Sequence, residues 1–357
     1  MANLVVNCRF LTQRITGVQR YAIEISRRLK NIQPSTRFVT PRNILHKELA
    51  RELGAEIIGK RTGYYWEQIE LPAFMKKSSP GGLLINLANM APIRYPNKIV
   101  TIHDVAPLRF PRSYSRRFSY TYKLMLPLIT RTSQSIISDS HFSKEELTQL
   151  LAVPESRVRV IPAAVSSPFN SGRDNSVEVC EKPYILSVAS LDPRKNFARL
   201  LEAFSLLKKG TIKLVIVGSE NRVFSSESMK SLKRVKPNVI FTGPVEDNCL
   251  KALYDNAALF VYPSLYEGFG LPPLEAMACG CPCVVSSAAS LPEVCGDAAL
   301  YCDPYDVDDI ASKISMVLSD DQLRRDLIHR GRERVKRFSW DKSAGAIMDV
   351  ISEALTV

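Results

Sequence analysis

The chain has 357 residues, 45% hydrophobic and 24% charged, with a net charge of +12. This length exceeds what one hydrophobic core usually organises, so we expect two domains, and the composition is that of a globular protein. No apolar run reaches the roughly 18 residues of a membrane-spanning helix, and the N-terminal residues fit a first strand better than a signal peptide, so we expect a cytoplasmic protein.

The first half of the chain alternates strand and helix patterns. Val18, Tyr21, Ala22, Ile25 and Leu29 recur at helical spacing after a turn at Thr16-Gly17. A further helix is expected in SKEELTQLL, with Ser143 as its N-cap and Glu146 as the capping-box partner. The expected strands are NLVVNC, RFVTP, GGLLINLA, KIVTIHD, SIISDS and RVRVIPAAV.

Residues 166–182 are rich in Ser, Asn, Gly and charge, and we interpret them as a linker. Beyond them strands again alternate with helices, which predicts an α/β protein with two doubly wound parallel sheets, the first in residues 1–168 and the second from residue 169 onward. The strands expected in the second series are YILSVAS, IKLVIVGS, VIFTGPV, LFVYPS, PCVVSS and AALYCD.

Two glutamates, Glu267 and Glu275, flank a glycine-rich turn in LYEGFGLPPLEAMACG. Pro272 and Pro273 fit the first turn of a helix, so the turn joins the carboxyl end of a strand to a helix N-terminus, where open α/β sheets bind ligands. Amides and the helix dipole there favour a phosphate, and a carboxylate suits a neutral diol such as a ribose. The pattern predicts a nucleotide-sugar site, although spacing alone leaves open a dipole role for Glu275 and an exposed loop position for Glu267.

Two motifs resemble metal sites without fitting them. Asp306-Val307-Asp308 has the D-x-D pattern, but it precedes a helical pattern and is better interpreted as a helix start. Cys279, Cys281 and Cys283 lack the paired C-x-x-C spacing of a zinc site and are expected to be buried thiols. We therefore expect no metal.

The segment YPSLYEGFGLPPLEAMACGCPCVVS closely resembles the E-x7-E signature of retaining glycosyltransferases of family 4, which have the GT-B fold. The resemblance covers nearly the whole chain, and it implies two Rossmann-like domains that face a central cleft. Residues 1–168 would form the acceptor-binding domain, residues 169–338 the nucleotide-sugar-binding domain, and helix 339–357 would pack back on the first. The other blocks that carry the resemblance are TGVQRYAIEI, TIHDVAPLRFP, SDSHFSKEEL, VIPAAV, VASLDPRKNFARLLEAF, LVIVGS, FTGPVEDNCLKALYDNAALFVYPS and RERVKRFSW.

The resemblance implies retaining transfer of a glycosyl group without a metal. Glu267 would lie near the donor sugar and Glu275 would bind the ribose. The backbone around the sugar and phosphates would come from Gly268, Phe269, Gly270 and Leu271.

A cation pair, Arg194 and Lys195, follows the first strand of the second series. An arginine can bind a diphosphate with two nitrogens and a lysine as a point charge, while the alternative is a solvated surface pair. Many relatives carry an arginine where this chain has Ser190. We expect Arg194 to take the role of that missing arginine.

Two residues of the first domain have implied roles at the donor. His103 is expected to contact the donor sugar through a hydrogen bond or its backbone carbonyl, although a lone histidine is more often structural. Gly17 would bring backbone amides close to the diphosphate.

Residues 1–168 carry a net charge of +14 and residues 169–357 one of −2, so the basic surface belongs to the first domain. In residues 110–131 cations mix with aromatic rings, which suits a membrane interface as well as an amphipathic core helix. We expect peripheral association with the inner face of the cytoplasmic membrane and a lipid-pyrophosphate-linked glycan acceptor. No nucleic-acid-binding motif is present, so nucleic acid is not expected as a partner. The basic residues expected at this surface are Arg112, Arg116, Arg117 and Lys123.

The motifs are most similar to mannosyltransferase-type members, which implies GDP-mannose as donor and bacterial polysaccharide or O-antigen synthesis as the pathway. UDP- and dTDP-sugars stay open as donors. The remaining alternatives are another enzyme on the same fold and an inactive scaffold or nucleotide-binding protein, and the presence of Glu267, Glu275 and Lys195 argues against an inactive remnant.

Overall fold

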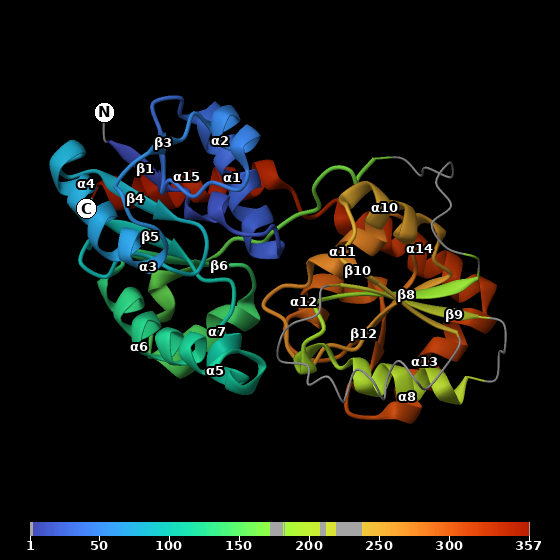
Figure 1. The fold of residues 1–357 in the computed structure, drawn as a ribbon. Coiled ribbons are helices and arrows are strands. Elements are labelled where there is room, and N and C mark those ends of the chain that lie inside the picture. Colours follow the sequence, from blue (N-terminus) through green and yellow to red (C-terminus); the bar gives the residue numbers. More distant parts are fainter. Residues whose placement is uncertain (1–2, 172–180, 182, 208–211, 219–237, 357) are drawn as a thin grey trace. The chain divides into compact units, whose positions relative to one another are not determined.

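A computed structural model describes residues 3–171, 181, 183–207, 212–218 and 238–356 (Figure 1). The chain divides into two compact units. Unit 1 contains Met1–Arg109, Arg117–Ala163 and Ser339–Val357, and unit 2 contains Phe110–Arg116 and Ala164–Phe338. Of the expected linker, residues 172–180 and 182 lie outside the described residues.

Unit 1 is built on a seven-stranded parallel sheet with the order β3-β2-β1-β4-β5-β6-β7. The six strands predicted in this half are confirmed. The two-residue strand β3 was not predicted, because its residues are exposed and show no apolar run. The strands are β1 (Leu4–Asn7), β2 (Arg37–Thr40), β3 (Glu56–Ile57), β4 (Leu83–Asn86), β5 (Lys98–Thr101), β6 (Ser135–Ser138) and β7 (Val158–Val160).

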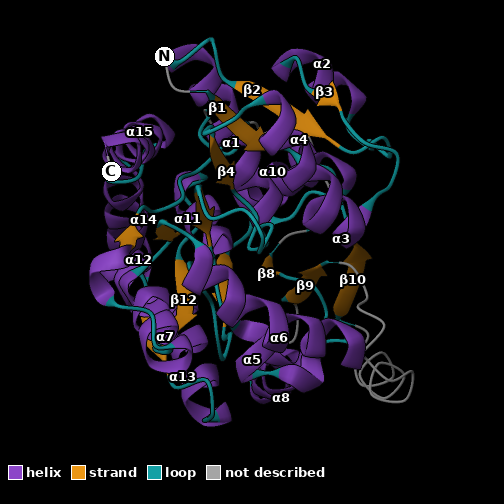
Figure 2. Ribbon diagram, turned by 90° about the vertical axis from the view of Figure 1, so that its left-hand side faces the viewer, coloured by secondary structure: helices purple, strands orange, loops and turns teal. Residues whose placement is uncertain are grey.

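Helices lie on both faces of this sheet (Figure 2). In α1 the predicted apolar positions Tyr21, Ala22, Ile25 and Leu29 are buried. The C-terminal helix α15 is part of unit 1, where the Trp340 ring meets the Tyr21 ring edge-on at 5.6 Å. The helices are α1 (Gly17–Ile32), α2 (Lys47–Leu53), α3 (Gly63–Tyr65), the π-helical turn η2 (Trp66–Glu70), α4 (Leu71–Ser78), α5 (Ala106–Arg109), α6 (Arg116–Thr132), α7 (His141–Leu151) and α15 (Trp340–Thr356), with short 3-10 turns η1 (Arg9–Thr12), η3 (Pro111–Ser113) and η4 (Glu155–Arg157).

The predicted N-cap of α7 was wrong. The helix begins at His141, because Ser140 already has an extended backbone and its Oγ accepts the Ser143 amide at 3.0 Å. Ser143 is therefore inside the first turn. Glu146 is not a capping partner either, since its carboxylate binds Arg109 at 2.6 and 2.8 Å.

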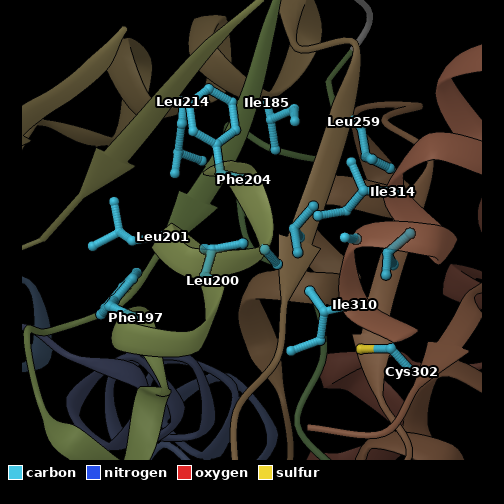
Figure 3. Close-up of a cluster of buried hydrophobic side chains, with 14 of the residues drawn as sticks. Ile185, Phe197, Leu200, Leu201, Phe204, Leu214, Leu259, Cys302, Ile310 and Ile314 are labelled. Carbon is cyan, nitrogen blue, oxygen red and sulfur yellow. The ribbon is translucent and has the colours of Figure 1, made fainter. Parts of the chain in front are cut away.

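Unit 2 repeats the same strand order in a six-stranded parallel sheet, β10-β9-β8-β11-β12-β13, and all six predicted strands are confirmed. The apolar faces of α8 and α13 pack on the sheet, with side chains such as Leu200, Phe204 and Ile310 facing Ile185 and Leu259 (Figure 3). The elements are β8 (Tyr184–Val188), η5 (Pro193–Lys195), α8 (Phe197–Leu206), β9 (Lys213–Val217), β10 (Val239–Gly243), α10 (Asp247–Asn256), β11 (Leu259–Tyr262), α11 (Leu271–Ala278), β12 (Cys283–Ser286), α12 (Leu291–Cys295), η6 (Gly296–Ala298), β13 (Leu300–Cys302), α13 (Val307–Ser319) and α14 (Asp321–Val335).

In each sheet the strand order reverses direction at one place, between β1 and β4 in unit 1 and between β8 and β11 in unit 2. Open parallel sheets bind ligands beyond the carboxyl ends of the strands at this switch point. The predicted α/β class with two doubly wound sheets is confirmed, and each sheet has one such position.

Candidate active site

The turn between β11 and α11 lies at the switch point of unit 2. Gly270 has a φ of +113°, and a Cβ atom built there would lie 2.7 Å from Leu291 Cδ2, so the turn requires glycine. Ser290 Oγ lies 2.9 and 2.7 Å from the carbonyl oxygens of Glu267 and Phe269, which share its single proton. These bonds hold the turn in a fixed conformation.

This turn offers fewer unpaired amides than the position of a helix N-terminus alone suggests. Pro272 and Pro273 have no N–H, so only Leu271 contributes an amide among the first three residues of α11. In the part of the chain that the structure describes, the amides of Phe269, Gly270 and Leu271 donate to no protein acceptor. Three consecutive amides are therefore available to an anion.

Glu267 is only 8% exposed, which rules out the exposed loop position. Its Oε1 accepts from Lys195 Nζ and from Ser264 Oγ, each at 2.5 Å, and Arg194 Nη1 lies 3.9 Å from Oε2. Burial alone would raise the pKa of Glu267, but the charges of Lys195 and Arg194 and the hydrogen bonds outweigh it and hold the pKa below its ordinary value. The carboxylate is therefore ionised.

Arg194 is buried and the Lys195 side chain is only 10% exposed, so the two are not a solvated surface pair. Asp192 caps this short turn by accepting the Arg194 amide at 2.9 Å, and Arg194 Nη1 donates to the carbonyl of Tyr266 at 3.0 Å. Lys195 Nζ also donates to Tyr262 Oη at 3.0 Å. Both cations therefore bind the segment that carries Glu267. Glu267 follows Lys195 by 72 residues in the sequence.

Glu275 is also buried, one turn inside α11. Tyr254 Oη donates to its Oε2 at 3.3 Å. Burial and the charge of Glu275 raise the pKa of Tyr254, so the hydroxyl keeps its proton and acts as a donor. Sequence analysis missed Tyr254, as well as Tyr262, Ser264 and Ser290, because single hydroxyl residues at these separations form no recognisable pattern.

The remaining two predicted donor residues belong to unit 1. Gly17 is the exposed first residue of α1. His103 is buried after β5, where Nδ1 lies 2.6 Å from Asp139 Oδ2 and Nε2 lies 3.0 Å from the carbonyl of Leu87. Burial would lower the pKa of His103, but Asp139 outweighs this effect and raises it.

Both ring nitrogens of His103 are therefore engaged with the protein, and a protonated ring donates to both acceptors. Its backbone carbonyl accepts from Ser143 Oγ at 3.0 Å and keeps a second lone pair. Of the two contacts expected for His103, this geometry favours the backbone carbonyl.

Neither metal-like motif forms a cluster of ligands. Asp306 caps α13 by accepting the amides of Asp308 and Asp309 at 2.9 and 3.1 Å, which confirms the predicted helix start. Cys279, Cys281 and Cys283 are buried free thiols. Over the described residues, no group of three or more His, Cys, Asp or Glu side chains is arranged to hold a metal ion.

The basic segment contributes exposed residues to η3, which belongs to unit 2, and to α6, which from Arg117 onward belongs to unit 1. The apolar side chains Tyr120, Leu124 and Leu128 are 64%, 51% and 44% exposed and recur every four residues, which places them on one side of α6. No helix in the described ranges is long and apolar enough to cross a membrane. The four predicted basic residues, Arg112, Arg116, Arg117 and Lys123, are all exposed there.

Comparison with known proteins gives consistent matches for both halves of the chain. Residues 171–334 match the family model "Glycosyl transferases group 1", and residues 15–167 match "Glycosyltransferase Family 4". O-antigen chain mannosyltransferase B of Escherichia coli is 34% identical over 262 residues, which cover 70% of this chain and 68% of that protein. The serotype-specific mannosyltransferase WbdA of Escherichia coli is 33% identical over 264 residues, but the matched region spans only 32% of WbdA. The solved structure of sucrose-phosphate synthase from Thermosynechococcus elongatus superposes with a TM-score of 0.75 and 18% identity, over 100% of both chains.

Proposed function

Because the chain belongs to the group 1 glycosyl transferases of family 4, we propose that it is a retaining mannosyltransferase that uses GDP-mannose. The predicted GT-B fold and glycosyltransferase class are confirmed by the family and structural matches. The observation that carries the proposal is the buried Arg194-Lys195-Glu267 cluster at the switch point of unit 2. The choice of mannose is supported by the names of the relatives, which are mannosyltransferases.

We assign the nucleotide-sugar to the β11–α11 turn. As the bond between the sugar and the diphosphate breaks, negative charge grows on the leaving group while the sugar becomes oxocarbenium-like. Arg194, Lys195 and the amides of Phe269, Gly270 and Leu271 can stabilise this charge. Glu275, which already accepts from Tyr254, has capacity for the hydroxyls of the ribose.

The proposal that no metal is required places a strict demand on the cluster. Asp192 Oδ2 lies 3.7 Å from Arg194 Nε, and Glu267 pairs with Lys195, so two carboxylates already face the two cations. A bound diphosphate must therefore draw Lys195 or Arg194 away from its carboxylate, or rely on the amides. Activity in the presence of a metal chelator therefore decides whether these groups are sufficient without a metal ion.

We propose a glycan on a lipid carrier as acceptor, in bacterial polysaccharide or O-antigen synthesis, with α6 resting on the inner face of the cytoplasmic membrane. This is supported by the exposed stripe Tyr120, Leu124 and Leu128 beside exposed cations. A basic, amphipathic helix of this kind binds anionic lipid surfaces through buried apolar area and charge together.

A donor panel in the presence of EDTA tests the proposal. GDP-mannose, UDP-glucose, UDP-N-acetylglucosamine, UDP-galactose and dTDP-rhamnose are incubated with the wild type, Glu267→Ala and Glu275→Ala, and the released nucleotide is measured. We expect slow hydrolysis of GDP-mannose that both substitutions abolish. Hydrolysis of a UDP- or dTDP-sugar would reassign the donor, a requirement for added metal would refute the metal-free account, and absence of both hydrolysis and binding would favour an inactive scaffold.

A further inference from the structure

A second buried carboxylate lies at the switch point of unit 1. Asn7 and Asn86 are the last residues of β1 and β4 and are paired neighbours in the sheet. Asn7 Nδ2 donates to Asn86 Oδ1 and to Glu67 Oε1, each at 3.0 Å. Glu67 comes from η2, a single π-helical turn, and such turns are frequent at functional sites.

Only half of the Glu67 carboxylate has partners. The residue is 1% exposed, and its Oε1 accepts from Asn7 and from Arg9 Nε at 3.0 Å. No residue that the structure describes donates to Oε2, which is also buried. A buried acceptor without a donor is costly, so this atom requires an explanation.

Arg9 presents the complementary group. Its Nε is held by Glu67 and its guanidinium lies over the Tyr64 ring at 5.1 Å. Within the described ranges, its two terminal nitrogens donate to no protein acceptor. A small hollow, partly open to solvent, borders both side chains and is lined by Asn7, Arg9, Phe10, Gln13, Glu67 and Leu87 among others.

We propose that Arg9 and Glu67 bind one hydroxyl group of the acceptor sugar and so determine acceptor specificity. A hydroxyl both donates and accepts, so it can donate to Glu67 Oε2 and accept from a terminal nitrogen of Arg9. The two side chains form an ion pair with no net charge, which favours a neutral group over a phosphate. The small size of the hollow fits a hydroxyl or hydroxymethyl group rather than a whole sugar ring.

The inference rests on the proposed function, in which unit 2 holds the donor. A hydroxyl of the donor sugar would satisfy the same two atoms, so the experiment has to separate the two sources. We favour the acceptor because none of the donor contacts assigned above uses Arg9 or Glu67, and because the charged and amide groups proposed for the diphosphate and ribose lie in unit 2.

The test compares wild type, Glu67→Gln and Glu70→Gln. Glu67→Gln keeps an acceptor for Asn7 and Arg9 but replaces Oε2 with a donor. Glu70 is the matched control, since it lies on the same π-helical turn and accepts only the backbone amides of Lys60 and Arg61 in the described structure. Each protein is assayed for donor hydrolysis without acceptor and for transfer to methyl α-D-mannopyranoside and its 2-, 3-, 4- and 6-deoxy analogues, with binding of the same glycosides followed by NMR.

In the wild type we expect one deoxy analogue to be about tenfold or more poorer in kcat/KM, because it leaves Oε2 unpaired. Glu67→Gln should lose this discrimination and accept the parent glycoside about tenfold less well, with donor hydrolysis unchanged, and Glu70→Gln should match the wild type. The proposal is overturned if Glu67→Gln keeps the discrimination, if it lowers donor hydrolysis, or if the wild type neither uses nor binds any of these glycosides. Absence of both donor hydrolysis and donor binding in the wild type would instead refute the proposed function.

Discussion

The substitution Lys195→Met separates the stability of the buried cluster from its activity. It leaves Glu267 buried without its lysine partner, with Ser264 as hydrogen-bond donor and Arg194 at 3.9 Å as the nearest remaining cation. Removing one partner of a buried ion pair costs about 3–5 kcal/mol, and the remaining cation places the expected loss near 3 kcal/mol. The double variant Lys195→Met/Glu267→Gln removes both charges, so we expect stability within about 1 kcal/mol of the wild type, with no activity.

The assay must report on unit 2. Both tryptophans, Trp66 and Trp340, lie in unit 1, so their fluorescence during urea unfolding serves as the internal control and should not change. Hydrogen exchange of peptides from β8 and β11, measured across the same urea series, reports on unit 2. A loss below about 1 kcal/mol in Lys195→Met, or a double variant less stable than either single one, would refute the reasoning.

Four further predictions follow from other parts of the structure. The pKa of Glu267 is lowered from its ordinary 4.5, so the stability that this carboxylate contributes is complete above pH 4.5 and is lost as the pH falls through the lowered value. The pH at which unit 2 unfolds in acid should therefore shift in Glu267→Gln. Lys98 is fully buried, and burial lowers its pKa from 10.5 to about 7. The stability of unit 1 should therefore rise by at most about 5 kcal/mol as the pH increases from 7 to 10.5. Tryptophan fluorescence should show this rise in the wild type and not in Lys98→Met. Gly270→Ala should destabilise unit 2 by about 1–3 kcal/mol and abolish donor hydrolysis, because it forces a side chain to a φ of +113°, whereas Gly345→Ala in α15, with open space around it, should be neutral or stabilising. Arg117→Glu/Lys123→Glu should weaken binding to phosphatidylglycerol vesicles by more than about tenfold at low salt, while the charge-matched Arg325→Glu/Arg337→Glu on the exposed surface of unit 2 should not.

The strands and the turn at Glu267 could be predicted because both depend on local patterns. Buried parallel strands have continuous apolar runs, and a strand followed by Gly-x-Gly and two prolines indicates a turn into a helix. The same local reasoning placed the N-cap of α7 at Ser143 and not Ser140, since either serine fits the pattern and only the extended backbone of Ser140 decides between them.

Contacts between distant parts of the chain could not be predicted. Nothing in the sequence pairs Lys195 with Glu267, or Glu67 with Asn7, 60 residues away. These partners meet because they follow strands whose carboxyl ends lie at one edge of a sheet, so their identity depends on register and loop conformation. The occupation of both ring nitrogens of His103 by Asp139 and Leu87 has the same origin.

The central claim is that the β11–α11 turn of unit 2 binds the nucleotide, and a calorimetric titration with GDP in EDTA tests it most directly. We expect GDP to bind the wild type and the control Glu333→Ala, whose carboxylate pairs only with Lys336 on the exposed surface of α14 within the described structure. Glu275→Ala should weaken binding about tenfold or more, because the ribose loses its acceptor. Equal affinity for wild type and Glu275→Ala, or no binding to either, would contradict the account.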